Sequence, residues 1–312
     1  MSDKKKLVLS TGCKPLDNLL LGGFPLGAPS LVFGMPNLGK TWLCFQTACS
    51  CTREEKYGGL NRPALYLDTE SFFTPVIFDR FYGYFRNRWK DLSSEPRIDL
   101  LRIKDIFDLG ARFGIQYEII QEERRVSAIA KFPTERQSKL AEKKGGPVKQ
   151  TQQSSDWLKE SEVWKRMEEK NYGVLILDSL TVPIKSVIPK GTQHLPGRGT
   201  LVTSLLGTLY PIAIHFNAAV IVTDHITRNP MSPGYVYGIG TPWGGQDVTY
   251  YIKYQIGLYN ALKDQREKLG PDGHRLRRFE RHRFPGMERE LVLVMLGKDL
   301  GYVSVPKGSI KA

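Results

Sequence analysis

The most restrictive feature of this sequence is the stretch Gly34-Met35-Pro36-Asn37-Leu38-Gly39-Lys40-Thr41. It fits the pattern G-x-x-x-x-G-K-[ST], and it stands between the apolar run Ser30-Leu31-Val32-Phe33 and a helix-like run that begins at Thr41. Glycines let backbone N–H groups curl around a phosphate, Lys40 supplies a point charge, and the Thr41 hydroxyl suits Mg²⁺. A chance Gly-rich turn is the alternative, but the flanking strand and helix are the context that this motif requires. We therefore place a nucleotide site at residues 34–41 together with Trp42, the next residue.

Length, composition and charge set broad limits on the class of protein. The chain has 312 residues, of which 41% are hydrophobic, so it can bury a sizeable core. A formal net charge of +13 favours a polyanionic partner such as nucleic acid, although a merely soluble protein can also be basic. No uninterrupted apolar stretch is long enough to span a membrane, and Lys4-Lys5-Lys6 precedes only three apolar residues. We expect a cytoplasmic protein with no membrane partner.

The cysteine pattern argues against a metal centre. The chain has four cysteines, Cys13, Cys44, Cys49 and Cys51, and no pair of them has C-x-x-C spacing. Three of them fall on the helix expected after the glycine-rich loop. We expect free, buried thiols of a reducing compartment.

Apolar runs separated by helix-length segments predict the fold class. The runs are Ala64-Leu65-Tyr66-Leu67-Asp68, Asp99-Leu100-Leu101-Arg102-Ile103, Gly173-Val174-Leu175-Ile176-Leu177-Asp178 and Ala218-Ala219-Val220-Ile221-Val222-Thr223. Continuous apolar strands of this kind are typical of a parallel sheet covered by helices on both faces. We predict an α/β fold with polar residues at the carboxyl ends of the strands, where such sheets bind ligands.

The domain prediction is a tail at residues 1–8 followed by one domain at residues 9–312. Residues 117–170 are charged and rich in turn formers, and they predict an insertion flanked by helical pieces such as residues 157–169 rather than a second domain. In the last part, strand-like runs at 250–262 and 291–296 lie on either side of Gly270-Pro271-Asp272-Gly273. These runs predict antiparallel strands that extend the sheet.

Two acids that follow predicted strands are candidates for nucleotide chemistry. Asp178 ends an apolar run and fits the acid that supports Mg²⁺, whereas Glu70 lies just past another strand and fits a general base. The alternative for Glu70 is a solvated loop acid or a charge at a helix N-terminus.

The ordered set of motifs resembles the core ATPase of the RecA/RadA recombinases, and particularly archaeal RadA and its shorter paralogues of the RadB and RadC types. The resemblance runs from residue 9 to about residue 302. The matching segments, in family order, are Ser10-Thr11-Gly12, Leu16-Asp17, Leu19-Leu20, the 34–41 loop, Leu67-Asp68-Thr69-Glu70, Leu175-Ile176-Leu177-Asp178-Ser179-Leu180-Thr181, Gly197-Arg198-Gly199-Thr200-Leu201, Val220-Ile221-Val222-Thr223 and Pro242-Trp243-Gly244-Gly245.

The resemblance implies a RecA-like ATPase core that uses ATP and Mg²⁺. It implies that Lys40 and Thr41 bind phosphate and Mg²⁺, that Glu70 activates water with Lys40 as the second catalytic residue, and that Asp178 supports the metal. It also implies two DNA-facing loops, one around Arg198 and one at residues 227–243. The expected function is assistance to homologous recombination and DNA repair with slow ATP hydrolysis, alongside a RadA-type recombinase.

The second of these loops has a composition suited to single-stranded DNA. Arg228, Tyr235, Tyr237 and Trp243 offer a cation and aromatic faces in a stretch rich in Gly and Pro. We expect single-stranded and double-stranded DNA as partners. The alternative is that these aromatic residues pack the loop onto the domain.

The sequence also departs from RadA in three places. The helix-hairpin-helix domain and the Phe-x-x-Ala hook of RadA have no counterpart before Leu9, and Tyr237-Gly238-Ile239-Gly240-Thr241 replaces the Asp-Pro pair that caps a neighbour's nucleotide. An amide usually follows the fourth strand, where this chain has Thr223-Asp224-His225. His225 is a candidate γ-phosphate sensor or DNA relay, or simply a satisfied polar residue. The departures count against strand exchange and long filaments, so we expect a monomer or small oligomer.

Two ambiguities remain at the sequence level. The basic stretch at residues 263–283 is either a contact for DNA phosphates or a solvated strand face. The alternative function is a regulatory ATP-binding module resembling the KaiC-type ATPases, which would act through protein partners. A hexameric helicase core is the weaker third possibility, because no second basic domain is visible.

Overall fold

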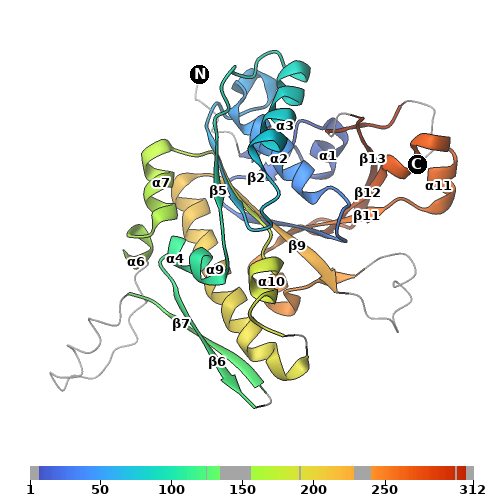
Figure 1. Ribbon diagram of the computed structural model, residues 1–312. Helices are drawn as coiled ribbons and strands as arrows, with labels where there is room; N and C mark the ends of the chain where they lie inside the picture. Colours follow the sequence, from blue (N-terminus) through green and yellow to red (C-terminus); the bar gives the residue numbers. More distant parts are fainter. Residues whose placement is uncertain are drawn as a thin grey trace, which may run out of the picture.

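A large, mostly parallel sheet forms the centre of the molecule (Figure 1). The computed structural model describes residues 7–123, 125–133, 156–189, 191–227, 240–298 and 301–306. Within them, ten strands form one sheet in the order β14-β13-β12-β11-β3-β9-β8-β4-β5, with β10 paired to β9. The bounds are β3 Pro29–Gly34, β4 Ala64–Asp68, β5 Ile98–Arg102, β8 Val174–Asp178, β9 Ala219–Thr227, β10 Thr241–Pro242, β11 Tyr254–Asn260, β12 Leu276–Arg283, β13 Glu290–Leu296 and β14 Tyr302–Ser304.

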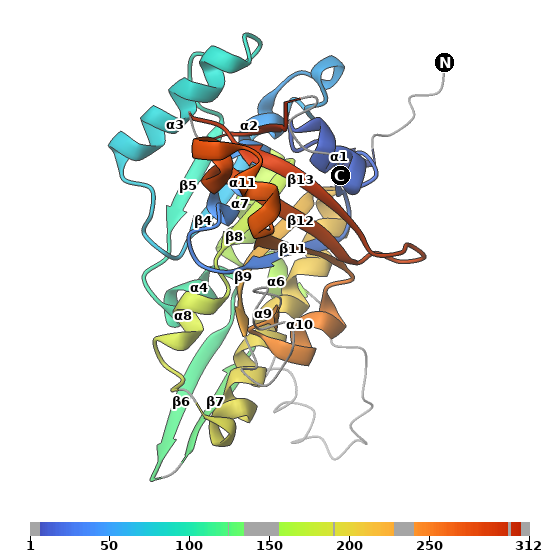
Figure 2. The same cartoon turned by 90° about the vertical axis from the view of Figure 1, so that its right-hand side faces the viewer.

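Strand direction divides this sheet into two halves. The pairs from β11 through β3, β9, β8 and β4 to β5 are all parallel, whereas β11, β12, β13 and β14 pair antiparallel. Figure 2 shows the antiparallel strands from the side, beside α1 and α11. The α/β fold with antiparallel strands at its C-terminal end is therefore confirmed.

Helices cover both faces of the parallel half because its strands are apolar on both sides. In β4, Leu65 and Leu67 belong to one buried cluster while Ala64 and Tyr66 belong to the other. The helices α1 Lys14–Leu19, α2 Lys40–Thr52 and α3 Pro75–Arg88 cover the second face. The first face carries α4 Ile106–Arg112, α7 Glu162–Lys170, α8 Thr181–Lys185, α9 Leu195–Phe216 and α10 Gly245–Tyr251.

The helix α9 is long and apolar enough to cross a membrane by length and composition. Its side chains Leu201, Leu205 and Leu209 are nevertheless fully buried in the cluster against the sheet. The helix therefore has the packing of a core helix in a globular domain.

One arginine joins the helices to the sheet at the end remote from the glycine-rich loop. The Arg62 guanidinium donates to the main-chain oxygens of Asn171 at 2.9 Å and Asn217 at 3.0 Å, which are the C-caps of α7 and α9. It also donates to the main-chain oxygen of Phe216 at 3.0 Å. A cation at two helix C-termini satisfies carbonyls that have no intrahelical partner.

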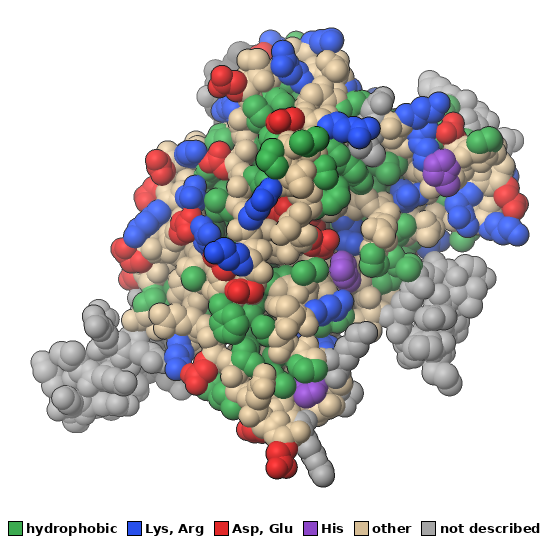
Figure 3. Space-filling model, in the orientation of Figure 1, with side chains coloured by type: hydrophobic (Ala, Val, Ile, Leu, Met, Phe, Trp, Pro, Cys, Tyr) green, Lys and Arg blue, Asp and Glu red, His purple; other side chains and the backbone are tan. Residues whose placement is uncertain are grey.

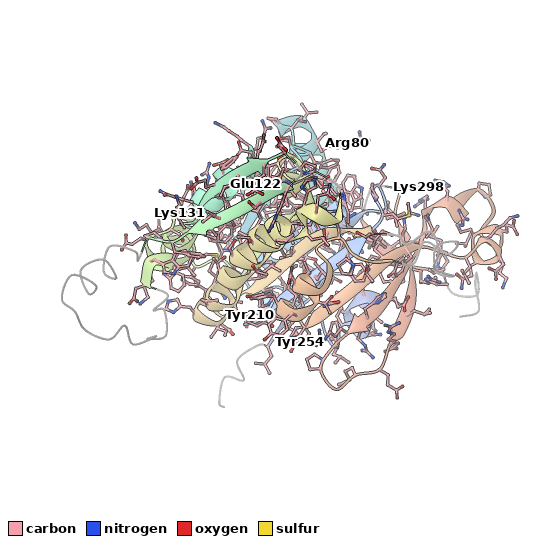
Figure 4. The ribbon with its side chains drawn as sticks, turned by 90° about the horizontal axis from the view of Figure 1, so that it is seen from below. Arg80, Glu122, Lys131, Tyr210, Tyr254 and Lys298 are labelled. Atoms are coloured by element: carbon pink, nitrogen blue, oxygen red, sulfur yellow. The ribbon has the colours of Figure 1, made fainter. Side chains whose placement is uncertain are left out.

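Part of the predicted insertion is regular structure. The strands β6 Gln116–Glu122 and β7 Arg125–Lys131 form a separate antiparallel hairpin that packs on α9. Figure 4 labels Glu122 and Lys131 on this hairpin and Tyr254 at the start of β11. The short helix α6 Asp156–Lys159 and α7 follow, as the helical pieces predicted there require. The hairpin itself was not predicted.

The predicted strand at residues 250–262 needs correction, whereas the prediction for the cysteines is confirmed. The run at residues 250–262 was predicted as one strand, but its first two residues belong to the end of helix α10, and β11 begins only at Tyr254. The helix is favoured there because it buries Val248 in the cluster that contains the apolar side chains of α9. The remaining elements are β1 Val8–Leu9, β2 Phe24–Pro25, α11 Lys263–Glu267 and short 3₁₀ turns at Glu55–Tyr57, Thr192–His194 and Gly270–Arg275. All four cysteines are buried and outside any disulfide, as predicted.

Candidate nucleotide site

The glycine-rich loop joins β3 to α2 at the carboxyl end of the parallel strands. Gly39 is the N-cap of α2 and has a left-handed backbone with φ of 105°, which favours glycine. Lys40 is the first helical residue, and its Nζ donates to the main-chain oxygens of Gly34 at 3.1 Å and Met35 at 3.0 Å. The lysine thus lies along the inside of its own loop.

The Lys40 ammonium is buried among acids. Its residue is 6% exposed, and burial lowers the pKa of Lys40 from its usual value. The nearby carboxylates of Asp178 and Glu70 oppose that shift by favouring the charged ammonium. The three side chains that the sequence assigned to one nucleotide site are therefore gathered by the fold.

Asp178 ends β8 as a buried and hydrogen-bonded acid. Its Oδ2 accepts from the Tyr66 hydroxyl at 2.6 Å, and its Oδ1 accepts from Thr223. Burial raises the pKa of Asp178, while hydrogen bonds from Thr223, Tyr66 and Thr41 lower it. The two residues predicted to serve Mg²⁺, Asp178 and Thr41, thus lie close to each other.

This donor set fits Mg²⁺ at a nucleotide. One carboxylate and one hydroxyl are oxygen ligands, and Mg²⁺ at phosphate sites takes few protein ligands beside phosphate oxygens and water. Among the described residues, no group of three or more His, Cys, Asp and Glu side chains could hold a metal alone. A Mg²⁺ site here would therefore depend on the nucleotide.

Glu70 lies at the end of β4 in a partly exposed position. Its Oε1 accepts from the Ser179 hydroxyl at 2.8 Å and lies 3.6 Å from Nε2 of His225. The neighbouring His225 side chain is the main cause that lowers the pKa of Glu70. Glu70 is therefore a carboxylate at neutral pH, the form that accepts a proton.

The neighbouring Asp68 has a different task. Its Oδ1 accepts from the backbone N–H of Glu70 at 3.1 Å and of Phe72 at 3.2 Å, and its Oδ2 accepts from that of Phe73 at 3.0 Å. Both oxygens therefore shape the loop that carries Glu70. Because both Asp68 oxygens already accept backbone hydrogen bonds, Glu70 is the better candidate for the general base.

Thr69 links the two acid-bearing strands beyond their ends. Its hydroxyl donates to the Ser179 oxygen at 2.8 Å and accepts from the Ser179 N–H at 2.6 Å. The link fixes the spacing between Glu70 and Asp178. Thr69 and Ser179 lie within the motifs at residues 67–70 and 175–181, but this link between them was not predicted.

Trp42 is placed differently from the loop backbone. Its ring stacks on Phe81 of α3 with a centroid separation of 3.4 Å and meets Phe72 edge to face. The ring is thus engaged in packing against α3, which leaves the main chain of Trp42 as its means of contact with a nucleotide. Its assignment stays a prediction.

The end of β9 connects the acids to the candidate DNA residues. Asp224 accepts from the N–H of His225 at 2.8 Å through Oδ1 and from the N–H of Gly244 at 3.0 Å through Oδ2. The N–H of Trp243 donates to the His225 oxygen at 2.8 Å. A continuous chain of contacts therefore runs from Glu70 through His225 to Trp243.

Two of the five predicted DNA residues meet each other. The Arg198 guanidinium lies over the Trp243 ring at 4.4 Å from its centroid, and Lys185 Nζ lies 5.0 Å from the same ring. Arg198 is in the first turn of α9, so the segment expected to be a loop around Arg198 is instead the start of a helix. Arg228, Tyr235 and Tyr237 lie outside the described residues.

The basic stretch at residues 263–283 was interpreted either as a contact for DNA phosphates or as a solvated strand face. Neither interpretation describes all of its arginines. Arg277, Arg278 and Arg281 of β12 are buried, so they form neither a solvated face nor a ready contact for DNA phosphates. On the face seen in Figure 3, Lys and Arg side chains are interspersed with Asp and Glu. Net charge alone therefore does not locate a nucleic-acid surface.

The geometry defines a P-loop fold of the RecA type, and comparison with known proteins supplies the family. The family model described as Rad51 matches residues 3–85. The DNA repair and recombination protein RadB of Methanococcoides burtonii is 32% identical over 258 residues, which cover 83% of this chain and 85% of that protein. The chain belongs to the RecA/RadA family of recombinases and their paralogues, as the sequence motifs predicted.

Two eukaryotic relatives match over smaller shares of their length. The fission yeast DNA repair protein rhp51 is 23% identical over 260 residues, 83% of this chain and 58% of that protein. The mouse DNA repair protein RAD51 homolog 2 is 36% identical over 99 residues, 30% of this chain and 28% of that protein. These names give no support to the KaiC-type alternative.

Proposed function

We propose that this protein is a Mg²⁺-dependent ATPase that binds DNA and assists homologous recombination and DNA repair. The observation that carries the proposal is the convergence of Lys40, from the glycine-rich loop, with Glu70 and Asp178 at the carboxyl ends of the adjacent parallel strands β4 and β8. The names of the relatives, which include DNA repair and recombination, support the biological setting.

Each side chain has a defined role in this proposal. Lys40 would hold the outer phosphates, and Asp178 with Thr41 would hold a Mg²⁺, which would supply charge neutralisation at the phosphates. Glu70 accepts the proton of the attacking water, because its carboxylate is ionised and partly exposed. His225 orients the Glu70 carboxylate.

The chain of contacts from Glu70 to Trp243 supports a link between nucleotide and DNA. A γ-phosphate beside Glu70 would reach His225, and the His225 oxygen already holds the Trp243 N–H. Arg198 of α9 and Trp243 would then contact the DNA strand. Arg228, Tyr235 and Tyr237, which belong to the same 227–243 segment as Trp243, would contact it too. Single-stranded DNA is the first expected ligand, because a cation beside an aromatic face suits unpaired bases.

The assembly, location and protein partner that we propose are those expected from the sequence. Residues 9–312 act as one domain in a monomer or small oligomer, in the cytoplasm and without a membrane partner. A RadA-type recombinase is the expected protein partner. Long filaments are not expected, because residues 237–241 lack the Asp-Pro pair by which RadA caps a neighbour's nucleotide, and a head-to-tail assembly needs both of its complementary faces.

The decisive experiment compares the wild type with Lys40→Ala. ATP turnover and the affinity for labelled single- and double-stranded DNA are measured with and without ATP. Lys40→Ala should abolish turnover, whereas the control Lys56→Ala removes an exposed lysine paired with Glu54 and should change nothing. Unchanged turnover in Lys40→Ala would reject the site. Turnover without any DNA binding would instead favour a regulatory ATPase.

A further inference from the structure

The outer side of the glycine-rich loop is held by two side chains from the C-terminal strands. The Tyr302 hydroxyl donates to the Leu38 oxygen at 3.0 Å and lies 3.2 Å from the Gly39 oxygen. Nε of Arg277 donates to the same Leu38 oxygen at 3.0 Å. The Leu38 carbonyl therefore accepts two hydrogen bonds, which matches its two lone pairs.

These hydrogen bonds fix the direction of the next N–H group. In a planar trans peptide, the carbonyl oxygen and the following N–H point in opposite directions. Because the Leu38 oxygen points toward Arg277 and Tyr302, the Gly39 N–H points away from them. Asn37 and Gly39, the residues on either side of Leu38, both have positive φ, 62° and 105°, so the loop backbone enters the left-handed region immediately before and after Leu38.

The approach of Tyr302 depends on both the loop and α2. A Cβ on Gly39 would lie 2.4 Å from the Tyr302 hydroxyl, so a side chain at that position would displace it. The Tyr302 N–H donates to Oε1 of Gln46 in α2 at 2.6 Å, and the ring meets Phe279 edge to face at 5.1 Å. The hydroxyl is therefore held in place from several sides.

Arg277 is anchored independently. Its Nη1 donates to the His274 oxygen at 2.7 Å, and the residue is 9% exposed. Burial lowers the pKa of Arg277, but an arginine with a lowered pKa is still a cation at neutral pH. Its hydrogen bond to Leu38 is accordingly charge-assisted, the stronger kind.

We propose that Tyr302 and Arg277 are positioning residues of the nucleotide site, which hold the Leu38–Gly39 peptide so that the Gly39 N–H faces the phosphates. The proposal rests on the proposed nucleotide function of the 34–41 loop. It assigns a role in phosphate binding to strands β12 and β14, which lie beyond the parallel half of the sheet and carry none of the motif residues.

The test removes one hydroxyl and nothing else. Tyr302→Phe keeps the buried ring but frees the Leu38 carbonyl from one of its two donors. The Kd for MgADP should rise about fivefold, the size of one hydrogen bond of about 1 kcal/mol. The KM for ATP should rise with it while kcat stays at the wild-type value, because the contact acts on binding rather than on the reacting atoms.

Tyr82→Phe is the matched control. The Tyr82 hydroxyl on α3 also donates to a main-chain carbonyl, that of Ser93 at 2.9 Å, but away from the glycine-rich loop. Both variants should lower the melting temperature by similar amounts, and only Tyr302→Phe should change the Kd. Equal Kd values for the two variants and the wild type would overturn the proposal and leave the nucleotide site intact.

A second variant tests whether the two side chains act on one peptide. Arg277→Gln should also raise the Kd for MgADP, and the variant that combines it with Tyr302→Phe should show less than the product of the two single effects. Strictly multiplicative effects would contradict a shared target. If Arg277→Gln does not fold, the comparison of Tyr302→Phe with Tyr82→Phe decides alone. A wild type that binds no MgADP would instead reject the nucleotide function itself.

Discussion

The two halves of the central sheet contain buried charge in different ways. In the parallel half, the buried acids Asp68, Asp178 and Asp224 lie at or near the carboxyl ends of β4, β8 and β9. In the antiparallel half, β12 carries three arginines within the strand, Arg277, Arg278 and Arg281, each less than 10% exposed. Charge at strand ends is available to a ligand, whereas charge within a strand binds the protein's own backbone.

The arginines of β12 are not equivalent in this respect. Arg281 donates to the main-chain oxygens of Leu19 at 3.0 Å and Glu288 at 3.1 Å, so it ties α1 and the β12–β13 turn to the sheet. Arg278 lies over the Tyr259 ring at 5.2 Å, and its Nε and Nη2 have no hydrogen-bond partner within the described residues. One arginine is satisfied and the other is not.

The largest expected effect lies in the parallel half. Glu70→Gln should lower kcat for ATP hydrolysis by about 10²–10⁴-fold, because the amide keeps the shape of the side chain but cannot accept a proton. Its nucleotide affinity and urea midpoint should stay close to those of the wild type. Turnover near the wild-type rate would show that the partly exposed acid is structural, as the arginines are.

The next effect lies in the antiparallel half and should appear as stability rather than activity. Arg281→Met should lower the free energy of unfolding by about 3 kcal/mol, because two carbonyls lose their donor. Arg278→Met should be neutral or stabilising, since it removes a buried cation without hydrogen bonds at two of its nitrogens. Urea unfolding measures both. Equal losses would mean that Arg278 has the same structural importance as Arg281.

A smaller effect tests whether Arg198 and Trp243, beside the parallel half of the sheet, bind DNA. Trp243→Ala should weaken binding to single-stranded DNA by about 1–3 kcal/mol with an unchanged salt slope. Arg198→Ala should reduce that slope by about 0.7 in a log–log plot, one phosphate contact. Because the two side chains stack, the double variant should lose less than the sum.

The outcome that counts against these loops is equally clear. If both variants bind DNA like the wild type across a salt series, Arg198 packs Trp243 as Arg281 packs α1, and the proposed DNA surface is wrong. Fluorescence anisotropy with a labelled oligonucleotide at several salt concentrations supplies the measurement.

The smallest expected effect concerns pH. The pKa of Glu70 is lowered, mainly by the neighbouring His225 side chain, so the proposed base stays ionised to a lower pH than usual. The same contact stabilises the fold above the ordinary pKa of a glutamate, and this contribution is lost as pH falls through the lowered value. His225→Asn should therefore move the acid limb of the kcat profile upward. An unmoved limb would remove His225 from the site.

The parallel half could be predicted from the sequence because its signals are local. The loop motif and the apolar runs at 64–68 and 174–178 each specify one element, and parallel strands bring their carboxyl ends together. The positions of Glu70 and Asp178 then follow from the sheet. The order of motifs was specific enough to predict the family as well.

The antiparallel half could not be predicted to the same depth. The strand β12 reads Leu-Arg-Arg-Phe-Glu-Arg-His-Arg, which has the composition of a solvated strand. The carbonyls that accept hydrogen bonds from its buried arginines come from distant segments such as Leu19 and Leu38. Tyr302 carries no motif at all. The β6–β7 hairpin was missed because its exposed acids and glutamines resemble those of a turn-rich insertion, although Tyr117 and Ile119 alternate with polar residues as in a half-buried strand.

The position of Arg62 has a consequence for the lifetime of the folded state. Its guanidinium joins segments that are 109 and 155 residues away along the chain, so these bonds form only after β4, β8 and β9 have assembled. Contacts that form after the folding barrier slow unfolding without speeding folding. We therefore expect Arg62, at the end of the sheet remote from the nucleotide site, to slow spontaneous unfolding and so to protect the folded chain against proteolysis.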